Sequence, residues 1–377
     1  MRWNPDPQRS NMVLGPTWLE HSGSVPIHIH LGWSVDTEDV TGSLISQIEK
    51  VLLPHVTRIA SLDFPYWSSF TLVNAIFKLC DSQEVQSLKS LGLDIASGYI
   101  EPIPWSIQSL RGLVNLKLRS IHASTLKMDD LALAMSNSPG LRLIELLKLH
   151  IEQGSNHHLP IVNLPDLRFL SLREINPKAL TRLLSLVSPG NYGLHFEVEV
   201  YDSPTDVVDS ITLFMSKAHI VSIVLWDIKT RNISLMERYF SSLTSLRNMI
   251  LNTMHDRDKV DITGTLESLM ISSHDGRTPR FPALEVFVLA GFTLYDRLQD
   301  KIKEFIQIHS LRALGLSRGV VSSAQGYTGI EAPAVVISRW AESRGVSDIL
   351  NAHDSTILDN RLSGRLRNRL LGMGQWG

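Results

Sequence analysis

Two histidines near the start of the chain have a spacing that could hold a metal ion. His28 and His30 are two residues apart, so both side chains would project from the same face of an extended strand. A zinc site needs three or four convergent ligands, and no carboxylate pattern nearby supplies the others. His157 and His158 are adjacent in a polar stretch, where neighbouring side chains diverge. We therefore expect structural or surface histidines and no metal.

The sequence contains none of the motifs that usually carry an active site. There is no Gly-x-Ser-x-Gly turn, no phosphate-binding loop and no Gly-x-Gly-x-x-Gly fingerprint, and the many Ser, His and Asp residues follow no catalytic spacing. The polar segments 255–258 and 274–280 are typical of solvated turns. The single cysteine, Cys80, excludes an intramolecular disulfide and a thiolate zinc site, and its apolar neighbours predict a buried position. We expect no enzyme and no cofactor.

Charge and hydropathy limit the classes of partner. The 377 residues carry a formal net charge of −2, which gives no overall attraction to phosphate backbones or anionic membranes. No run of about 18 apolar residues occurs, and the first ten residues lack the apolar centre of a secretory signal. We expect a cytoplasmic or nuclear protein that binds neither nucleic acid nor membranes.

A repeated spacing of apolar residues organises most of the chain. One apolar residue is followed by a second three positions later and by a third two positions after that, as in Leu167, Leu170 and Leu172. The last two would point to one face of a short strand, and the first would anchor the entry into it. The same spacing occurs at Ile59/Leu62/Phe64, Leu88/Leu91/Leu93, Leu113/Leu116/Leu118, Ile220/Ile223/Leu225, Leu246/Met249/Leu251, Leu266/Leu269/Ile271, Leu284/Phe287/Leu289 and Leu311/Leu314/Leu316, and in two registers at Leu141/Ile144/Leu146 or Ile144/Leu147/Leu149.

Amphipathic segments, with apolar residues three or four apart, separate these strands and predict helices. Most copies recur every 25 to 29 residues, which lies within the period of leucine-rich repeats. No copy can bury its apolar face alone, so neighbouring copies must stack. The sequence therefore predicts an α/β fold: an irregular, right-handed leucine-rich-repeat-like solenoid with strands on the concave side and helices on the convex side. The expected helices lie within 68–80, 124–140, 177–190, 203–218 and 293–310.

These patterns also divide the chain into segments. We expect an irregular N-terminal segment at 1–16, the solenoid at 17–350 and a basic C-terminal tail at 351–377, in which arginines are interleaved with leucines. In the stretch "TWLEHSGSVPIHIHL", Gly23 suits a turn and the residues after Pro26 alternate as a first strand.

The same stretch resembles a known family. Together with the following helical segment and "VTRIASLDF", it resembles the junction between the F-box and the leucine-rich-repeat-like domain in a large fungal family of F-box proteins. Units such as "PGLRLIEL", "LPDLRFLSL" and "FPALEVFVL" resemble the repeats of that family over most of the chain. The positions that match the junction are Leu19, Glu20, Ser22, Gly23, Pro26, His55 and Arg58, and His21 stands where the family usually has arginine.

The resemblance implies the target-binding part of an F-box protein, which presents a protein for ubiquitination. An F-box docks on the Skp-type adaptor of a cullin-based ubiquitin ligase, but the sixteen residues before Thr17 include three prolines and cannot form its three helices. We therefore expect a protein-recognition module without its own F-box, with adaptor and cullin as partners only if an F-box is supplied. The alternatives are a stand-alone repeat scaffold unconnected to ubiquitination, or a small-molecule enzyme with a deep polar pocket of convergent titratable groups.

A repeat protein of this kind usually binds its target on the concave side. The residues that alternate with the inward apolar positions are therefore the candidate surface. Basic positions in the middle of the chain give way to acidic ones and then to apolar ones. Trp226 among these is either a candidate binding anchor or a residue that packs on a neighbouring strand or under a loop. The candidate surface consists of Lys117, Arg119, Lys148, Arg173, Glu197, Glu199, Val224, Trp226 and Val288.

Overall fold

The computed structural model shows a mixed α/β protein in which parallel strands alternate with helices. The chain divides into two compact units, Met1–Tyr192 (unit 1) and Gly193–Gly377 (unit 2). The predicted segments 1–16 and 351–377 lie outside the residues that the structure describes, as do His157 and His158. The described residues are 19–30, 42–64, 70–82, 87–94, 110–121, 126–154, 159–199, 205–226, 240, 242–252, 263–270, 279–290, 293–294, 296–309, 311–317 and 320–321.

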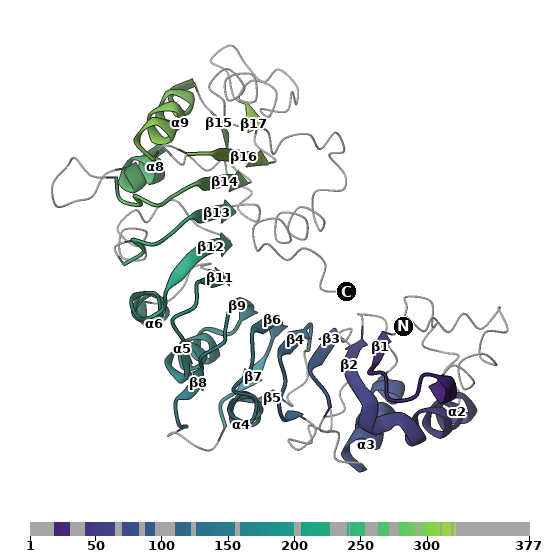
Figure 1. Ribbon diagram of the computed structural model, residues 1–377. Helices are drawn as coiled ribbons and strands as arrows, with labels where there is room; N and C mark the ends of the chain where they lie inside the picture. Colours follow the sequence, from purple (N-terminus) through teal and green to yellow (C-terminus); the bar gives the residue numbers. More distant parts are fainter. Residues whose placement is uncertain are drawn as a thin grey trace. The chain divides into compact units, whose positions relative to one another are not determined.

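Unit 1 contains a parallel sheet whose strands follow one another in chain order (Figure 1). Parallel neighbours need a crossover connection, and amphipathic helices supply several of these connections. The predicted apolar triplets supply the buried side of the strands: Leu62 and Leu91 are 0% exposed and Leu116 is 1% exposed. The strands are β1 (Ile27–His30), β2 (Ile59–Phe64), β3 (Ser90–Asp94), β4 (Asn115–Arg119), β6 (Leu143–Leu149) and β9 (Phe169–Ile175).

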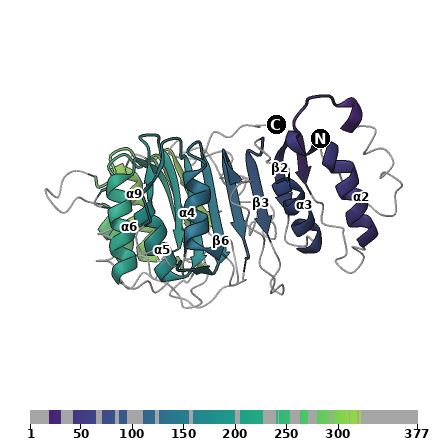
Figure 2. The same cartoon turned by 90° about the horizontal axis from the view of Figure 1, so that it is seen from below.

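The helices of unit 1 lie on one face of this sheet (Figures 1 and 2). Phe77 packs on Phe64 of β2, with ring centroids 6.3 Å apart, and Cys80 beside it is buried, as predicted. Pro177 occupies the first turn of its helix, also as predicted. The elements are α2 (Gly42–Leu52), a 3-10 helix (Leu53–Arg58), α3 (Phe70–Ser82), α4 (Met128–Ser136) and α5 (Pro177–Leu186), with short ladders between β5 (Leu126–Lys127) and β7 (Ile151–Glu152) and between β8 (Val162–Leu164) and β10 (Val187–Pro189).

Unit 2 has a similar arrangement of parallel strands in chain order, with helices on one face (Figure 1). Phe196 contacts Phe214 at a centroid distance of 5.1 Å, and Phe287 contacts Phe305 at 4.6 Å. These contacts join the sheet to the helices. The elements are β11 (Leu194–Glu199), α6 (Thr205–Lys217), β12 (Ile220–Trp226), β13 (Asn248–Asn252), α8 (Thr263–Met270), β14 (Val286–Ala290), α9 (Asp296–His309) and β16 (Ala313–Ser317), with a short ladder between β15 (Thr293–Leu294) and β17 (Val320–Val321).

One predicted strand is wrong. Leu266 and Leu269 belong to helix α8 and not to a strand, and both are 0% exposed. Two apolar residues three positions apart lie on the same side of a helix. The strand repeat begins with the same spacing, so the pattern alone does not distinguish a helix from a strand here. Ile271, the third member of that triplet, lies outside the described residues.

The structure also decides between the two registers that the sequence allows for β6. Ile144 is 1% exposed and Leu146 is 0% exposed, whereas Leu147 is half-buried. Ile144 pairs with Leu116 of β4, whose side chain is also in the core. The strand therefore uses Leu141/Ile144/Leu146, and Glu145 and Leu147 point to the other face of the sheet.

Several positions that carry the family resemblance meet around one guanidinium. Arg58 donates hydrogen bonds to the carbonyl oxygens of Leu19 (3.3 Å from Nη1) and Val25 (2.8 Å from Nη2). Its Nη2 also donates to Ser22 Oγ at 2.6 Å, and its Nη1 lies 3.3 Å from His55 Nδ1. Arg58 thus ties the segment before β1 to the end of the 3-10 helix that leads into β2.

Arg58→Lys is expected to lower the free energy of unfolding by about 1–2 kcal/mol, because an ammonium cannot reproduce the planar fork that reaches several acceptors at once. Urea denaturation followed by circular dichroism measures the change. Arg142→Lys is the matched control, since Arg142 is exposed and its charge is retained. Equal stabilities for the two variants would contradict the role given to Arg58.

Candidate functional site

The face of the unit 1 sheet that lies opposite the helices carries polar side chains from consecutive strands. Lys117 is aligned with Glu145, and Glu145 with Ser171. In the next row, Asp94 is aligned with Arg119, Arg119 with Leu147, and Leu147 with Arg173. Because side chains alternate along a strand, these residues share one face. We call it the strand face of unit 1, formed by Asp94, Lys117, Arg119, Glu145, Leu147, Ser171 and Arg173.

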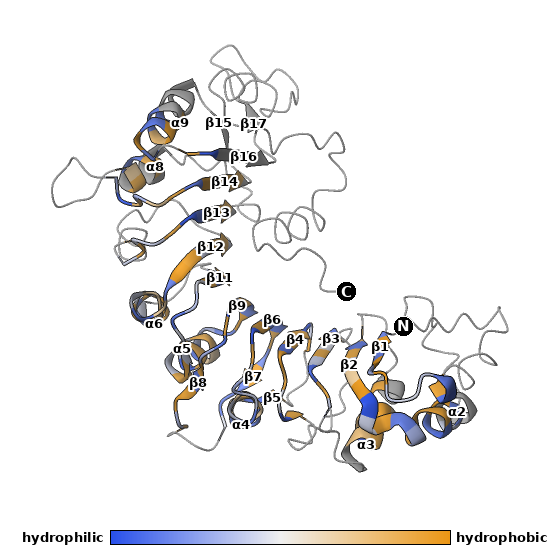
Figure 3. Cartoon of the chain, viewed as in Figure 1, coloured by the Kyte–Doolittle hydropathy of each residue, from blue (hydrophilic) through white to orange (hydrophobic). Residues whose placement is uncertain are grey.

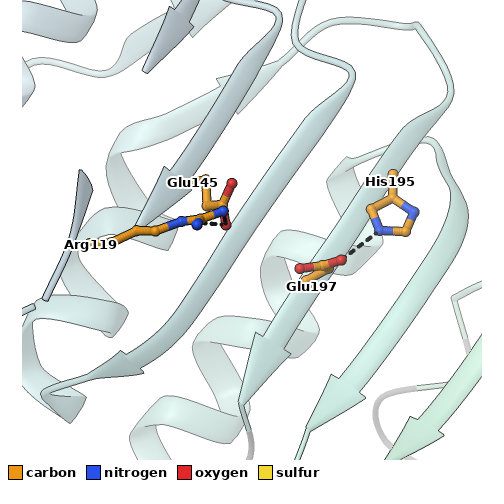
Figure 4. Close-up of polar contacts among 4 residues, drawn as sticks. All are labelled: Arg119, Glu145, His195 and Glu197. Atoms are coloured by element: carbon orange, nitrogen blue, oxygen red, sulfur yellow. Dashed lines mark hydrogen bonds and ion pairs between the residues drawn. The ribbon is translucent and has the colours of Figure 1, made fainter. Parts of the chain in front are cut away.

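An ion pair fixes the centre of the strand face. Arg119 of β4 contacts Oε1 of Glu145 on β6 through both Nη2 (2.7 Å) and Nε (3.1 Å) (Figure 4). The Glu145 side chain is 6% exposed and the Arg119 side chain 36% exposed, so the carboxylate lies beneath the guanidinium. Sequence reasoning did not select Glu145, because its position on this face depends on the register of β6. The pair holds one cation in a defined orientation at the surface.

The sequence predicts Lys148 on this face only in the second register of β6, which the structure does not use. Lys148 is exposed but has a φ of 56°, which takes it out of the regular alternation of β6. Ser120 (φ 54°) and Glu174 (φ 50°) adopt the same conformation immediately after the last strand-face residues of β4 and β9. The three neighbouring strands therefore share a residue of positive φ close to their C-terminal ends. The basic contribution to the strand face comes from Lys117, Arg119 and Arg173, which are all half-buried.

The two histidines of β1 also lie on the side away from the core. His28 is exposed, and His30 Nδ1 lies 2.8 Å from Asp63 Oδ2 on β2. Asp63 follows thirty-three positions later in the sequence, and only the pairing of β1 with β2 brings it beside His30. Gly23, with a φ of 55°, forms the predicted turn before β1.

A buried polar network occupies the start of the sheet in unit 2. His195 Nε2 lies 3.1 Å from Glu197 Oε1 (Figure 4). His195 Nδ1 lies 2.8 Å from Ser222 Oγ on the adjacent strand. His195 and Ser222 are each 2% exposed, and Glu197 is 8% exposed. Hydroxyl, imidazole and carboxylate are the groups of a nucleophilic relay, but this hydroxyl is closed to substrate. The network satisfies buried polar groups at the junction of β11 and β12.

The remaining predicted site residues lie along the same face of unit 2. Val224 of β12 and Val288 of β14 occupy one row, and each is only 4% exposed. Glu199 and Trp226 are aligned in the next row and are half-buried. Figure 3 shows β12 as a largely hydrophobic strand. Val224 and Val288 therefore lie on the face that the sequence predicts, but at 4% exposure each they offer little surface to a partner.

A small polar pocket lies on the helix side of unit 1. It has a volume of about 260 Å³ and is bordered by Asp129 of α4 and by one side of α5, including Lys178, Thr181 and Arg182. An acid and two cations thus line a space large enough for a small molecule. The hydroxyl of Ser185 at its border donates to the backbone carbonyl oxygen of Arg182 at 2.7 Å, and the described lining residues include no nucleophile bonded to a base. The pocket therefore gives no specific support to the enzyme alternative.

A histidine of unit 2 is buried between two backbone carbonyl groups. His309 of α9 is 4% exposed, with Nδ1 3.3 Å from the carbonyl oxygen of Phe281 and Nε2 3.2 Å from that of Leu269. Its ring also contacts Phe305, at a centroid distance of 4.4 Å. Burial disfavours the charged imidazolium and lowers the pKa of His309 from its usual value of 6.5, although both carbonyl contacts act in the opposite direction.

We expect unit 2 to lose stability as the pH falls below 6.5, because the unfolded chain then binds a proton that the folded histidine does not. This contribution is fully present above pH 6.5 and has a slope of at most about 1.4 kcal/mol per pH unit. Urea denaturation at several pH values between neutral and mildly acidic measures it. His309→Gln should remove this part of the pH dependence, and an unchanged slope in that variant would contradict the assignment.

The described residues contain no group of three or more His, Cys, Asp or Glu residues that could hold a metal ion. Within the same part of the chain, no helix combines the length and the apolar character needed to cross a membrane. A scan against protein-family models finds no matching family, and a search of the curated proteins finds no similar sequence. The family resemblance therefore rests on the sequence motifs alone.

Proposed function

We propose that the chain is an irregular leucine-rich-repeat-like solenoid whose strand face binds a target protein. The observation that carries this proposal is the strand face of unit 1, where consecutive strands present half-buried charged side chains on the side away from the helices. Such a face offers a row of polar side chains on a rigid sheet, which suits recognition of another protein. No catalytic step is assigned to it.

Regular backbone features support the repeat interpretation. Strands follow chain order within each unit, and Ser120, Lys148 and Glu174 turn the chain with the same positive φ at the ends of consecutive neighbouring strands. The helices of unit 1 share one face of the sheet (Figure 2). A stack of equivalent strand, turn and helix units would give all three features. We therefore include in the proposal that the solenoid is right-handed and has its strands on the concave side.

The resemblance extends the proposal to the substrate-receptor domain of an F-box protein. The matched residues Leu19, Ser22 and His55 each contact the guanidinium of the matched residue Arg58, which gives these positions a shared structural role. They belong to the junction beyond an F-box and not to the F-box itself. Delivery of the bound target to a Skp-type adaptor and a cullin therefore requires an F-box. A stand-alone repeat scaffold that binds the same target without ubiquitination is the alternative.

Affinity purification of the full chain from its native organism tests the proposal. The wild-type protein is compared with the double variant Lys117→Glu/Arg173→Glu on the strand face. Lys178→Glu, an exposed position on α5, is the control for a charge reversal elsewhere in unit 1. We expect a target protein that the wild type and the control capture and the double variant does not.

Identical captured proteins for all three chains would contradict binding through the strand face. Recovery of adaptor and cullin subunits with the target would support coupling to a ligase. A target recovered without those subunits would support the stand-alone scaffold.

A further inference from the structure

The chemistry of the strand face of unit 1 narrows the class of partner. Lys117 and Arg119 project from β4 and Arg173 from β9, so three cations occupy an area two strand spacings wide. Among the described residues, the side chain of Lys117 forms no hydrogen bond or ion pair. The residue is half-buried, so part of its aliphatic stem packs against the sheet while its ammonium group is available to attract an anion at short range.

Arg119 is prepared for a second carboxylate. Its Nε and Nη2 are both bound to Oε1 of Glu145, which leaves the remaining guanidinium N–H groups for another acceptor. Glu145 is 5% exposed, so it orients the guanidinium from below without presenting its own charge at the surface. A fixed guanidinium loses little rotational freedom when it binds, which favours the recognition of a carboxylate.

An apolar residue separates the two arginines. Leu147 of β6 lies between Arg119 and Arg173 in the same row and is half-buried. Since neighbouring strands are about 4.8 Å apart, the backbones of the two arginines are about 10 Å apart. Asp94 lies on the other side of Arg119 and would repel a further acidic group there. The row therefore consists of an acidic residue, a basic one, an apolar one and a second basic one: Asp94, Arg119, Leu147 and Arg173.

We propose that the strand face of unit 1 binds an acidic segment of the target protein in which two carboxylate residues flank an apolar one. One carboxylate pairs with Arg119 and Lys117, the apolar side chain packs on Leu147, and the second carboxylate pairs with Arg173. A nucleic acid fits less well, because three cations with Asp94 and Glu145 among them do not form a continuous basic stripe. This inference rests on the proposed function, since it specifies what the same face recognises.

Peptide display tests the inference without knowledge of the natural target. A library of random peptides is selected on the immobilised full chain, and the affinities of the enriched peptides are measured for the wild type, for Lys117→Glu/Arg173→Glu and for the control Lys178→Glu. Arg119 is left in place because its removal would leave Glu145 buried without its partner. Thermal melts of the variants check that unit 1 remains folded.

We expect enriched peptides with two acidic residues around an apolar one. Their affinity should fall about tenfold or more in the double variant, remain unchanged in Lys178→Glu and decrease with added salt. Enrichment of neutral or basic peptides that bind the double variant equally well would overturn the inference and leave the proposed function intact. The inference would also be overturned if no peptide were enriched on the wild type. The proposed function would be contradicted only if the wild type and both variants captured the same proteins in the purification experiment.

A polyuridine oligonucleotide serves as the comparison from another class of ligand. Its binding should be much weaker than that of the acidic peptides at the same salt concentration. An oligonucleotide that binds the wild type as tightly as the peptides, and loses affinity in the double variant, would identify the face as a nucleic-acid site and overturn the inference.

Discussion

Leu146→Asp is expected to unfold unit 1. Leu146 is 0% exposed in the core between β6 and the helices, so an aspartate there would bury a charge without a partner. Such a charge costs several kcal/mol, and the lost packing of the leucine adds about 2–5 kcal/mol. The sum is comparable to the whole stability of a typical domain, about 5–15 kcal/mol. Circular dichroism and size-exclusion chromatography should show an unfolded or aggregated protein.

Leu147→Asp is the matched control, because the same change is made one residue further along the strand. Leu147 is half-buried on the strand face, where a carboxylate can remain hydrated. We expect a change in the free energy of unfolding of less than about 1 kcal/mol and an unchanged elution volume. If Leu147→Asp unfolded the protein and Leu146→Asp did not, β6 would use the alternative register with Ile144, Leu147 and Leu149 in the core.

Gly190→Ala is expected to lower the free energy of unfolding by about 2–3 kcal/mol. A Cβ at this position would overlap the carbonyl oxygen of Pro165 and would lie 2.8 Å from its carbonyl carbon and Cα. Because these are backbone atoms, no side-chain rotation can relieve the overlap. Gly190 N also donates to the carbonyl oxygen of Leu164 at 3.2 Å, so any shift would weaken the contact beside the β8/β10 ladder. Urea denaturation measures the loss.

Gly140→Ala provides the comparison. Gly140 also follows a proline, but an added Cβ there would meet no atom within 4 Å. We expect no loss, or a gain of up to about 1 kcal/mol from the reduced freedom of the unfolded chain. Equal losses at Gly140 and Gly190 would show that the close approach to Pro165 is not the cause.

Much of the fold could be predicted because burial dictates it directly. An apolar triplet such as Leu167, Leu170 and Leu172 can be satisfied only if each member faces the core, and all three are at most 2% exposed. The helix at α6 and the buried position of Cys80 follow from the same rule. The triplet at Leu266 was assigned to the wrong element, because two apolar residues three positions apart satisfy a helix equally well.

The candidate site was less predictable, since it depends on which side chains become neighbours. The position of Glu145 under Arg119 follows from the pairing of β4 with β6, and a sequence that allows two registers for β6 does not specify it. The left-handed turn at Lys148 has no sequence signal, because glycine or asparagine is the usual residue for that conformation. The sequence predicts the correct strand for Trp226 and Val224. The alternation of side chains along a strand predicts the face on which a residue lies, but it does not predict how deeply that residue is buried.

The ion pair between Arg119 and Glu145 has an evolutionary consequence. Loss of Arg119 alone would leave a carboxylate that is 5% exposed without its main partner, and loss of Glu145 alone would release the guanidinium, so substitutions at these two positions are tolerated best together. The side chain of Lys117 has no comparable link among the described residues. Under the proposed function, new target preferences would therefore arise through single substitutions at Lys117, while the central pair is inherited as a unit.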